Sequence, residues 1–348
     1  LFTMISAAFQ ITVPMVVRQA VDSIPRFVRL FNLYEGTPAQ ADLYAFFFVA
    51  LLLFAGVIIG LSATSGLFMF LMRQTVVVAS RHIEYDLRNA LYDHLQQLSA
   101  TFYHEYSTGD VITRATDDIE KVRRYIGPAI MYVTRSLVMV MVAMSAMFFI
   151  SPTLTLYALL PMPLLAISVF FMAQMVHHRS EKLQEQYSTL TSRVQEALSG
   201  IRVLKAYTRE EAEAKAFENE SEQYKWRNLN LALVESAWRP SFLLLVGIST
   251  IIVVWMGGRL VAEGSITIGN IAEYIIYINM MTWPVASLGF VITMIQRASA
   301  SVIRLQKIMD TEPSIADGPQ TNPSLQSIEG RIAFENVWYQ YEGEDEPA

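Results

Sequence analysis

The sequence predicts an all-α membrane protein with six long transmembrane helices that extend beyond the bilayer. Of the 348 residues, 53% are hydrophobic and only 17% are charged, whereas a soluble domain usually has about 25% charged residues. Apolar stretches long enough to cross a bilayer core of about 30 Å recur along the chain. Residues 67–108 contain no glycine and no proline, and as one helix they would reach roughly 63 Å. A helix of that length must leave the membrane.

The six helices follow one another along the chain. We expect them at about residues 1–23, 42–98, 110–150, 154–205, 219–256 and 268–310. The third is apolar only from Ala129, so its first part is expected in water. Pro152 suits a break before the fourth helix, and the glycines of residues 257–264 suit a turn before the sixth.

The distribution of Lys and Arg predicts the orientation. Residues 73–124 carry seven and residues 179–227 carry nine, whereas the turns at 151–153 and 257–268 carry only Arg259. The positive-inside rule therefore predicts that the two charged segments and the C-terminus are cytoplasmic, in a multi-pass protein of the cell inner or plasma membrane. The expected outer loop at 18–42 is an exception, because it holds Arg18, Arg26 and Arg29.

The charged extensions carry apolar stripes. The fourth helix has apolar positions at alternating steps of four and three, and the second has them at steps of four. The positions are Leu183, Tyr187, Leu190, Val194, Ala197, Ile201 and Leu204, and Ile83, Leu87, Leu91 and Leu95. Such stripes are typical of helices that pack together in water, so we expect a helical bundle outside the membrane.

The composition changes after the sixth helix, which gives three segments: 1–310, 311–330 and 331–348. Residues 311–330 are rich in Pro, Ser and Gly and are predicted to be a linker. Residues 331–341 alternate apolar and polar side chains, which predicts the first strand of a soluble domain. We expect the chain to be a portion of a longer protein, since it begins inside an apolar helix and stops soon after this strand.

Several function classes are disfavoured. Cysteine is absent, and none of the five histidines lies in a zinc-binding pattern, so no metal site is predicted. The net charge of −6 does not suggest a nucleic-acid partner. No glycine is followed by lysine, which excludes the phosphate-binding GxxxxGK[ST] loop from this chain.

The chain resembles the membrane domain of ABC exporters of the six-helix, domain-swapped type. The resemblance rests on "LSATFYHEYSTGDVITRATDDIEKVR", "EALSGIRVLKAYTREEAEAKAF", the stretch from "GGRLVAEGS" to "RLQKIMD", and "GRIAFENVWYQYEGEDEPA". It covers nearly the whole chain. It implies half of a transporter, cut at the start of its α/β nucleotide-binding domain, with ATP and Mg²⁺ as cofactors of the full-length protein. This chain alone lacks the catalytic motifs of an ATP-hydrolysing translocase.

The resemblance also implies two short transverse coupling helices that dock on the nucleotide-binding domains. They are expected at about 99–108 and 206–215, with Phe102, Tyr103, His104, Glu105 and Tyr106 in the first and Tyr207, Thr208, Arg209, Glu210 and Glu211 in the second. Gly109 suits a change of direction after the first, and Asp110 favours a helix N-terminus. Tyr341 matches the aromatic residue that stacks on adenine; the alternative is a strand aromatic packed in a core.

Charged residues inside membrane segments indicate where a substrate might bind. The candidates, with the aromatic residues near them, are Arg135, Glu235, Trp238, Arg239, Glu273 and Tyr274. Three alternatives stay open: Glu235 and Arg239 could pair on one helix face, Arg135 could extend its charge to the interface, and Tyr274 could belong to an aromatic belt.

The function predicted from the resemblance is ATP-driven export of hydrophobic or amphipathic compounds by alternating access. The expected partners are a second half-transporter, identical or different, nucleotide-binding domains, membrane lipid and a hydrophobic small molecule. A lipid or lipopeptide flippase on the same scaffold is the alternative. A secondary transporter without ATP is disfavoured, because it has no need of such long cytoplasmic helices.

Overall fold

The computed structural model describes residues 1–314 and 330–338, and the regular structure within them is helical. The helices are α1 (Phe2–Leu33), α2 (Ala39–Gln97), α3 (Ala100–Glu105), α4 (Thr108–Thr113), α5 (Ile119–Arg124), α6 (Ile130–Ile150), α7 (Pro152–Leu159), α8 (Pro161–Ser199), α9 (Ile201–Ala206), α10 (Glu210–Ala262) and α11 (Ile268–Met309). Two π-helical turns, η1 (Arg114–Asp118) and η2 (Tyr125–Ala129), join α4, α5 and α6 into one rod. Six helical rods are long and apolar enough to cross a membrane, which confirms the all-α class.

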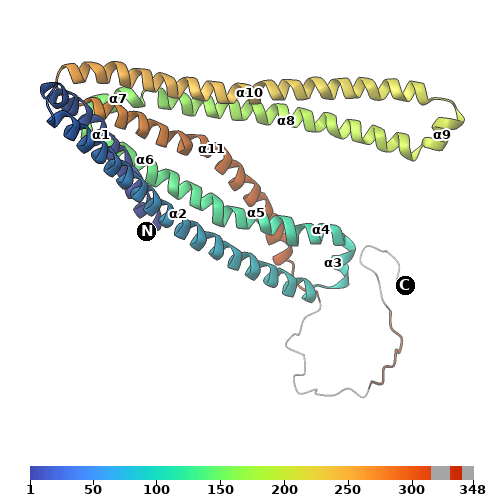
Figure 1. Cartoon of the computed structure of the whole chain (residues 1–348). Helices are drawn as coiled ribbons and strands as arrows, with labels where there is room; N and C mark the ends of the chain where they lie inside the picture. The colour runs from blue at the N-terminus through green and yellow to red at the C-terminus, as the bar shows by residue number, and fades with distance from the viewer. Residues whose placement is uncertain (315–329, 339–348) are drawn as a thin grey trace.

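The helices form two arms that meet at one end and diverge toward the other (Figure 1). The hairpin arm consists of α8 and α10, which lie side by side, with α9 between them at the far end. The bundle arm consists of α1 to α6 and α11. We call the end with the short connections at 34–38, 151 and 263–267 the loop end, and the end with α3 and α9 the tip end.

The first connection is shorter than predicted. Helix α1 continues to Leu33, so the expected loop at 18–42 is wrong and only residues 34–38 separate α1 from α2. Pro25 lies inside α1 without ending it, although an interior proline loses one helix hydrogen bond and its ring crowds the carbonyl four residues earlier. Phe27 stacks on Phe47 of α2, with ring centroids 3.9 Å apart, and this contact stabilises the additional turns.

The predicted fourth helix is divided into three. Pro161 has no backbone N–H to donate, and the chain makes a turn at Leu160 between α7 and α8. Gly200 then ends α8 with φ −92° and ψ 12°. The predicted fifth helix was also placed too late, because α10 begins at Glu210. Three glutamates in its first turn favour that start through the helix dipole.

The largest hydrophobic core lies near the loop end and contains residues of both arms. Its fully buried members include Met147 of α6, Leu154 of α7, Val253 of α10 and Tyr274 of α11. A second, smaller core lies at the tip of the bundle arm and contains Phe102. The two arms are therefore held together near the loop end.

The predicted strand at 331–341 is not found among its described residues, 331–338, which form no regular structure. A strand needs a neighbouring strand for its hydrogen bonds, and the described part of the chain offers none. Tyr341 and most of the predicted linker lie outside the described residues.

Candidate functional sites at the tip end and in the membrane

Helix α3 is the transverse helix expected at the tip of the bundle arm. It is shorter than the predicted 99–108, because the backbone is extended at Leu98 and Ser99 before it and at Tyr106 and Ser107 after it. The change of direction therefore falls before Gly109, which lies inside α4. Ser107 caps α4 by accepting a hydrogen bond from the backbone N–H of Asp110.

One face of α3 is anchored and the other is exposed. Phe102 is 6% exposed and packs with Leu95 and Ile308, so it joins α2 and α11 at the tip. The Tyr103 hydroxyl donates to the backbone carbonyl of Leu95 over 2.6 Å. His104 and Glu105 are exposed. The exposed face is available for a partner, while the buried face holds α3 in place.

Tyr106 adds a second anchor. Its ring stacks on Phe102 with centroids 4.6 Å apart. The Arg114 guanidinium lies 5.0 Å from the centroid of the same ring, and the Lys307 ammonium lies 5.9 Å from it. These cation–π contacts link α3 to η1 and to the last turns of α11.

Asp118 fixes η1 to α11 just behind α3. Arg304 donates to both carboxylate oxygens of Asp118 over 2.7 Å each. The Ser301 hydroxyl donates over 3.0 Å and the Lys121 ammonium over 3.1 Å. We call these four residues the clamp. Asp118 is 2% exposed, so this is a buried carboxylate whose hydrogen-bonding capacity is met by cations and a hydroxyl.

The clamp lies outside the bilayer. Asp118 is about 48 Å along its rod from Ile150 at the loop end, well beyond a core of about 30 Å. The Arg304 guanidinium holds the pKa of Asp118 well below its ordinary value of 3.8, against burial, which raises it; Lys121 and Ser301 lower it further. The folded protein therefore keeps this carboxylate charged.

This lowered pKa predicts an acid-resistant clamp. The unfolded chain takes up a proton at Asp118 near pH 4 while the folded chain does not, so the stabilisation is fully present above about pH 4 and is lost as the pH falls through the folded pKa. We expect the difference in unfolding temperature between the wild type and Asp118→Asn to be equal at about pH 8 and pH 5 and to shrink below about pH 4. A difference that already falls between pH 8 and pH 6 would contradict this assignment.

The second transverse helix, α9, lies earlier in the sequence than expected. It covers Ile201–Ala206 rather than 206–215, because Gly200 allows the turn out of α8. Tyr207, Thr208 and Arg209 form the turn that follows, while Glu210 and Glu211 already lie in α10. Tyr207 is 75% exposed. The tip of the hairpin arm thus presents α9 and an aromatic turn.

The turn after α9 contains a strained residue. Thr208 has φ +50°, which is unfavourable for a β-branched side chain. The N–H of Thr208 donates to Lys205 O and the N–H of Arg209 donates to Leu204 O. This is the Schellman pattern, in which glycine usually takes the left-handed position.

Thr208→Gly is therefore expected to stabilise the tip by about 1 kcal/mol, because glycine adopts this φ without strain. The effect is local, so we expect amide hydrogen exchange of residues 205–211 to slow about fivefold, as follows from that energy. Thr208→Ala serves as the control, since it keeps the Cβ and should not give the same protection. Faster exchange in Thr208→Gly would show that the threonine is favourable there.

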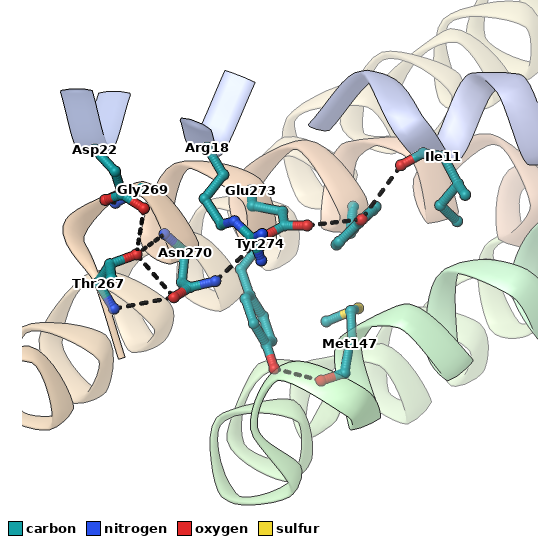
Figure 2. A network of polar contacts seen from close by, with 10 residues as sticks. Ile11, Arg18, Asp22, Met147, Thr267, Gly269, Asn270, Glu273 and Tyr274 are labelled. Atoms are coloured by element: carbon teal, nitrogen blue, oxygen red, sulfur yellow. Dashed lines mark hydrogen bonds and ion pairs between the residues drawn. The ribbon is translucent and has the colours of Figure 1, made fainter. Parts of the chain in front are cut away.

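Glu273 and Tyr274 lie in a buried polar network at the loop end (Figure 2). Glu273 is 0% exposed and accepts hydrogen bonds from Tyr277 Oη over 2.9 Å and from Asn270 Nδ2 over 3.2 Å. Its carboxylate is 3.5 Å from the Arg18 guanidinium of α1. The Tyr274 hydroxyl lies 2.7 Å from the Met147 carbonyl oxygen. Their polar atoms are occupied by protein partners, which favours a role in joining helices over substrate binding.

Arg135 is half-buried between α6 and the first two helices. Its guanidinium donates to the sulfur of Met69 over 3.0 Å. It lines a niche of about 10 Å³, roughly the space of one water molecule, with Thr3, Ser6 and Gln10 of α1. No carboxylate lies within ion-pair distance of Arg135 in residues 1–314 and 330–338. Its charge is therefore directed at the polar side of α1.

The α10 candidates lie apart from this niche. Glu235 and Arg239 are exposed, and no ion pair joins them in the part of the chain that the structure describes. Trp238 is half-buried and lines a small pocket with Leu165, Met172 and Phe242 between α8 and α10. The structure thus does not gather the six predicted residues into one site.

Sequence reasoning did not single out the clamp. Asp118 lies in a quoted motif but is one of several charges there, and Arg304 lies 186 residues further along the chain. Glu84 was missed likewise; it is 7% exposed and bonds to Arg81 and Arg88, with Arg123 3.4 Å away. An acidic residue on an otherwise apolar helix face was the available signal.

Comparison with known proteins decides the family. The family model described as "ABC transporter transmembrane region" matches residues 1–285. The chain belongs to this family. With its six membrane-length apolar helices, it is the multi-pass transmembrane domain of an ABC exporter, as the resemblance implied.

Three curated proteins are similar to this ABC exporter domain. A "Probable multidrug resistance ABC transporter ATP-binding/permease protein", YheI of Bacillus subtilis, is 30% identical over 85% of this chain and 51% of the relative. The ABC transporter ATP-binding protein YknU of the same organism is 32% identical over 74% and 44%. The multidrug resistance-like ATP-binding protein MdlA of Escherichia coli is 30% identical over 73% and 43%. The chain spans about half the length of the curated relatives it matches.

Proposed function

We propose that this domain is the membrane-spanning half of an ATP-driven pump that moves hydrophobic or amphipathic compounds out of the cytoplasm by alternating access. It would act with a second half-transporter, identical or different, and with ATP-binding domains that use ATP and Mg²⁺. The observation that carries the proposal is the position of α3 and α9 at the tips of two diverging arms (Figure 1). Three relatives carry "ATP-binding" in their names, which supports an ATP-driven cycle.

The tip end is proposed to be cytoplasmic, because most of the Lys and Arg residues lie toward it. The ATP-binding domains would dock on the exposed sides of α3 and α9, including His104, Glu105 and Tyr207. Because α3 is anchored to α11 through Phe102, and the clamp fixes η1 to α11 just behind it, a push on α3 would move the bundle arm as one body. Tyr341 is proposed to stack on adenine.

Arg135 is proposed to line the inward-facing substrate cavity, and it is the predicted substrate residue that the geometry supports best. In a full-length background whose cysteines outside these 348 residues have been replaced, Arg135→Cys is expected to react with a water-soluble thiol reagent in the nucleotide-free state and more slowly when ATP and vanadate trap the closed tips. A cysteine at 135 that never reacts in any state would refute this placement.

The test of function uses the full-length protein in proteoliposomes. We expect vanadate-sensitive ATP hydrolysis that rises with added hydrophobic drug, and drug movement that needs ATP. Stronger stimulation by a fluorescent lipid than by any drug would identify a flippase instead. Drug transport that is driven by a proton or sodium gradient and persists without ATP hydrolysis would overturn the proposal in favour of a secondary transporter.

A further inference from the structure

The loop end carries arginines whose charge the transport cycle does not explain. Arg18, Arg26 and Arg29 all lie on the second half of α1. The proposed orientation puts them on the side where positive charges are few. Arg259, the remaining arginine there, is neutralised by Glu263 at 3.0 Å. The arginines of α1 therefore need a separate account.

The carboxylates nearby do not neutralise Arg26. Glu273 is paired with Arg18 at 3.5 Å. Asp22 uses one oxygen to accept from the Gly269 N–H over 2.8 Å and the other to accept from the Thr267 hydroxyl over 2.7 Å. Figure 2 shows Asp22 directed at the start of α11 in this way. In the part of the chain that the structure describes, no carboxylate lies within 4.0 Å of the Arg26 guanidinium.

Arg26 and Arg18 face a common cavity. Eight residues separate them, so they lie within about 80° of each other on α1 at ~3.6 residues per turn. The cavity has a volume of about 510 Å³ and is lined by Arg18, Gln19, Ser23, Arg26, Phe54 and Asn270, among others. Three helices, α1, α2 and α11, thus contribute to its walls. It offers two guanidinium groups and two carboxamides, which are donors suited to an oxyanion.

The cavity also lies beside exposed apolar side chains of α2. Phe54 belongs to α2, whose neighbouring Leu52 and Leu53 are 56% and 65% exposed in this apolar segment. A ligand whose charged group enters the cavity can therefore keep its acyl chains along α2. Asp22 lies on the same wall and disfavours a dianion, so a monoanionic phosphodiester fits better than a phosphomonoester.

We propose that this cavity binds the phosphodiester headgroup of an anionic phospholipid. The guanidinium forks of Arg26 and Arg18 would hold the phosphate oxygens, and Gln19 would donate to the headgroup, while Asn270 stays bonded to Glu273. Because the ligand touches both α1 and α11, it would add to the contact that Arg18 and Glu273 make between these helices. The site does not depend on the proposed transport function.

Native mass spectrometry of the purified full-length protein tests the site with defined lipids. We expect dioleoyl phosphatidylglycerol to remain bound, dioleoyl phosphatidylcholine to bind at least tenfold more weakly, and phosphatidic acid to bind less than phosphatidylglycerol near pH 8. Arg26→Gln should weaken phosphatidylglycerol binding about tenfold. Arg29→Gln is the matched control, because Arg29 carries the same charge on the same helix but does not line the cavity, and it should change binding less than twofold.

Three outcomes would overturn the proposal. Equal weakening by Arg26→Gln and Arg29→Gln would indicate a diffuse surface charge rather than a site. Equal retention of phosphatidylcholine would indicate a purely apolar contact. Displacement of phosphatidylglycerol by the free phosphodiester glycerophosphoglycerol at equal concentration would show that a soluble phosphodiester, not a lipid, is the ligand.

Discussion

Asp118→Asn is expected to separate ATP hydrolysis from transport in the full-length protein. The clamp joins the rod that begins at α4 to α11 through three hydrogen bonds from Ser301 and Arg304 to one buried carboxylate, which also accepts from Lys121 of its own rod. Removing the charge weakens this contact by about 2 kcal/mol, since a hydrogen bond to a charged group contributes about 1.5–3 kcal/mol. Because Arg304 is partly exposed and solvent screens its charge, we expect a loss toward the lower end of that range. Transport per ATP hydrolysed should therefore fall several-fold.

The measurement is paired transport and ATPase assays on the same proteoliposomes. Asp117→Asn is the matched control, because Asp117 is the neighbouring residue, is exposed and has no ion pair among the described residues. It should leave the ratio of transport to hydrolysis unchanged. Transport and ATP hydrolysis that fall in equal proportion in Asp118→Asn would show that the clamp does not couple hydrolysis to transport. The same conclusion would follow if Asp117→Asn lowered the ratio of transport to hydrolysis as much as Asp118→Asn does.

Tyr274→Ala is expected to destabilise this domain by about 3 kcal/mol. Tyr274 is 0% exposed and belongs to the core that holds both arms together. Its removal leaves a cavity and leaves the hydroxyl of Thr155, 2.9 Å away, without this partner. Tyr274→Phe removes only the hydroxyl and should cost about 1 kcal/mol, as is typical between membrane helices.

Thermal unfolding in detergent measures both variants. Trp283→Ala is the control, because Trp283 is an aromatic residue of the same helix that is 64% exposed, and it should change the unfolding temperature little. A loss in Trp283→Ala equal to that in Tyr274→Ala would mean that aromatic area, not burial at the junction of the arms, sets the stability.

The helical architecture was predictable because apolar periodicity and length are local properties of the sequence. The connections were less predictable. Helix α1 was expected to end near residue 23 but continues through Pro25 to Leu33, and Phe27 stacks on Phe47 across the hairpin. The second transverse helix lies earlier than expected, because α8 ends at Ser199 and the chain turns at Gly200. The local pattern marked neither the packing partner of α1 nor the end of α8.

The candidate site was predictable in part. Charge in an apolar segment drew attention to Arg135 and Glu273, but the charge alone does not tell whether a partner exists. Glu273 has three partners on α1 and α11, whereas the side-chain hydrogen bond of Arg135 within the described residues goes to the sulfur of Met69. The clamp joins residues far apart along the chain, so only the fold brings Asp118 and Arg304 together.

ATP-binding domains are proposed to move the two arms through α3 and α9. These 348 residues contain no cysteine, so, once any cysteine elsewhere in the full-length protein is replaced, spin labels can be placed at His104→Cys in α3 and Val203→Cys in α9, both exposed positions. Double electron–electron resonance on the full-length protein in nanodiscs would measure the distance between the two labels in the nucleotide-free state and in the state trapped by ATP and vanadate. The account predicts a shift to a distinct, shorter distance between the tips. An unchanged distance distribution in a protein that hydrolyses ATP would contradict it.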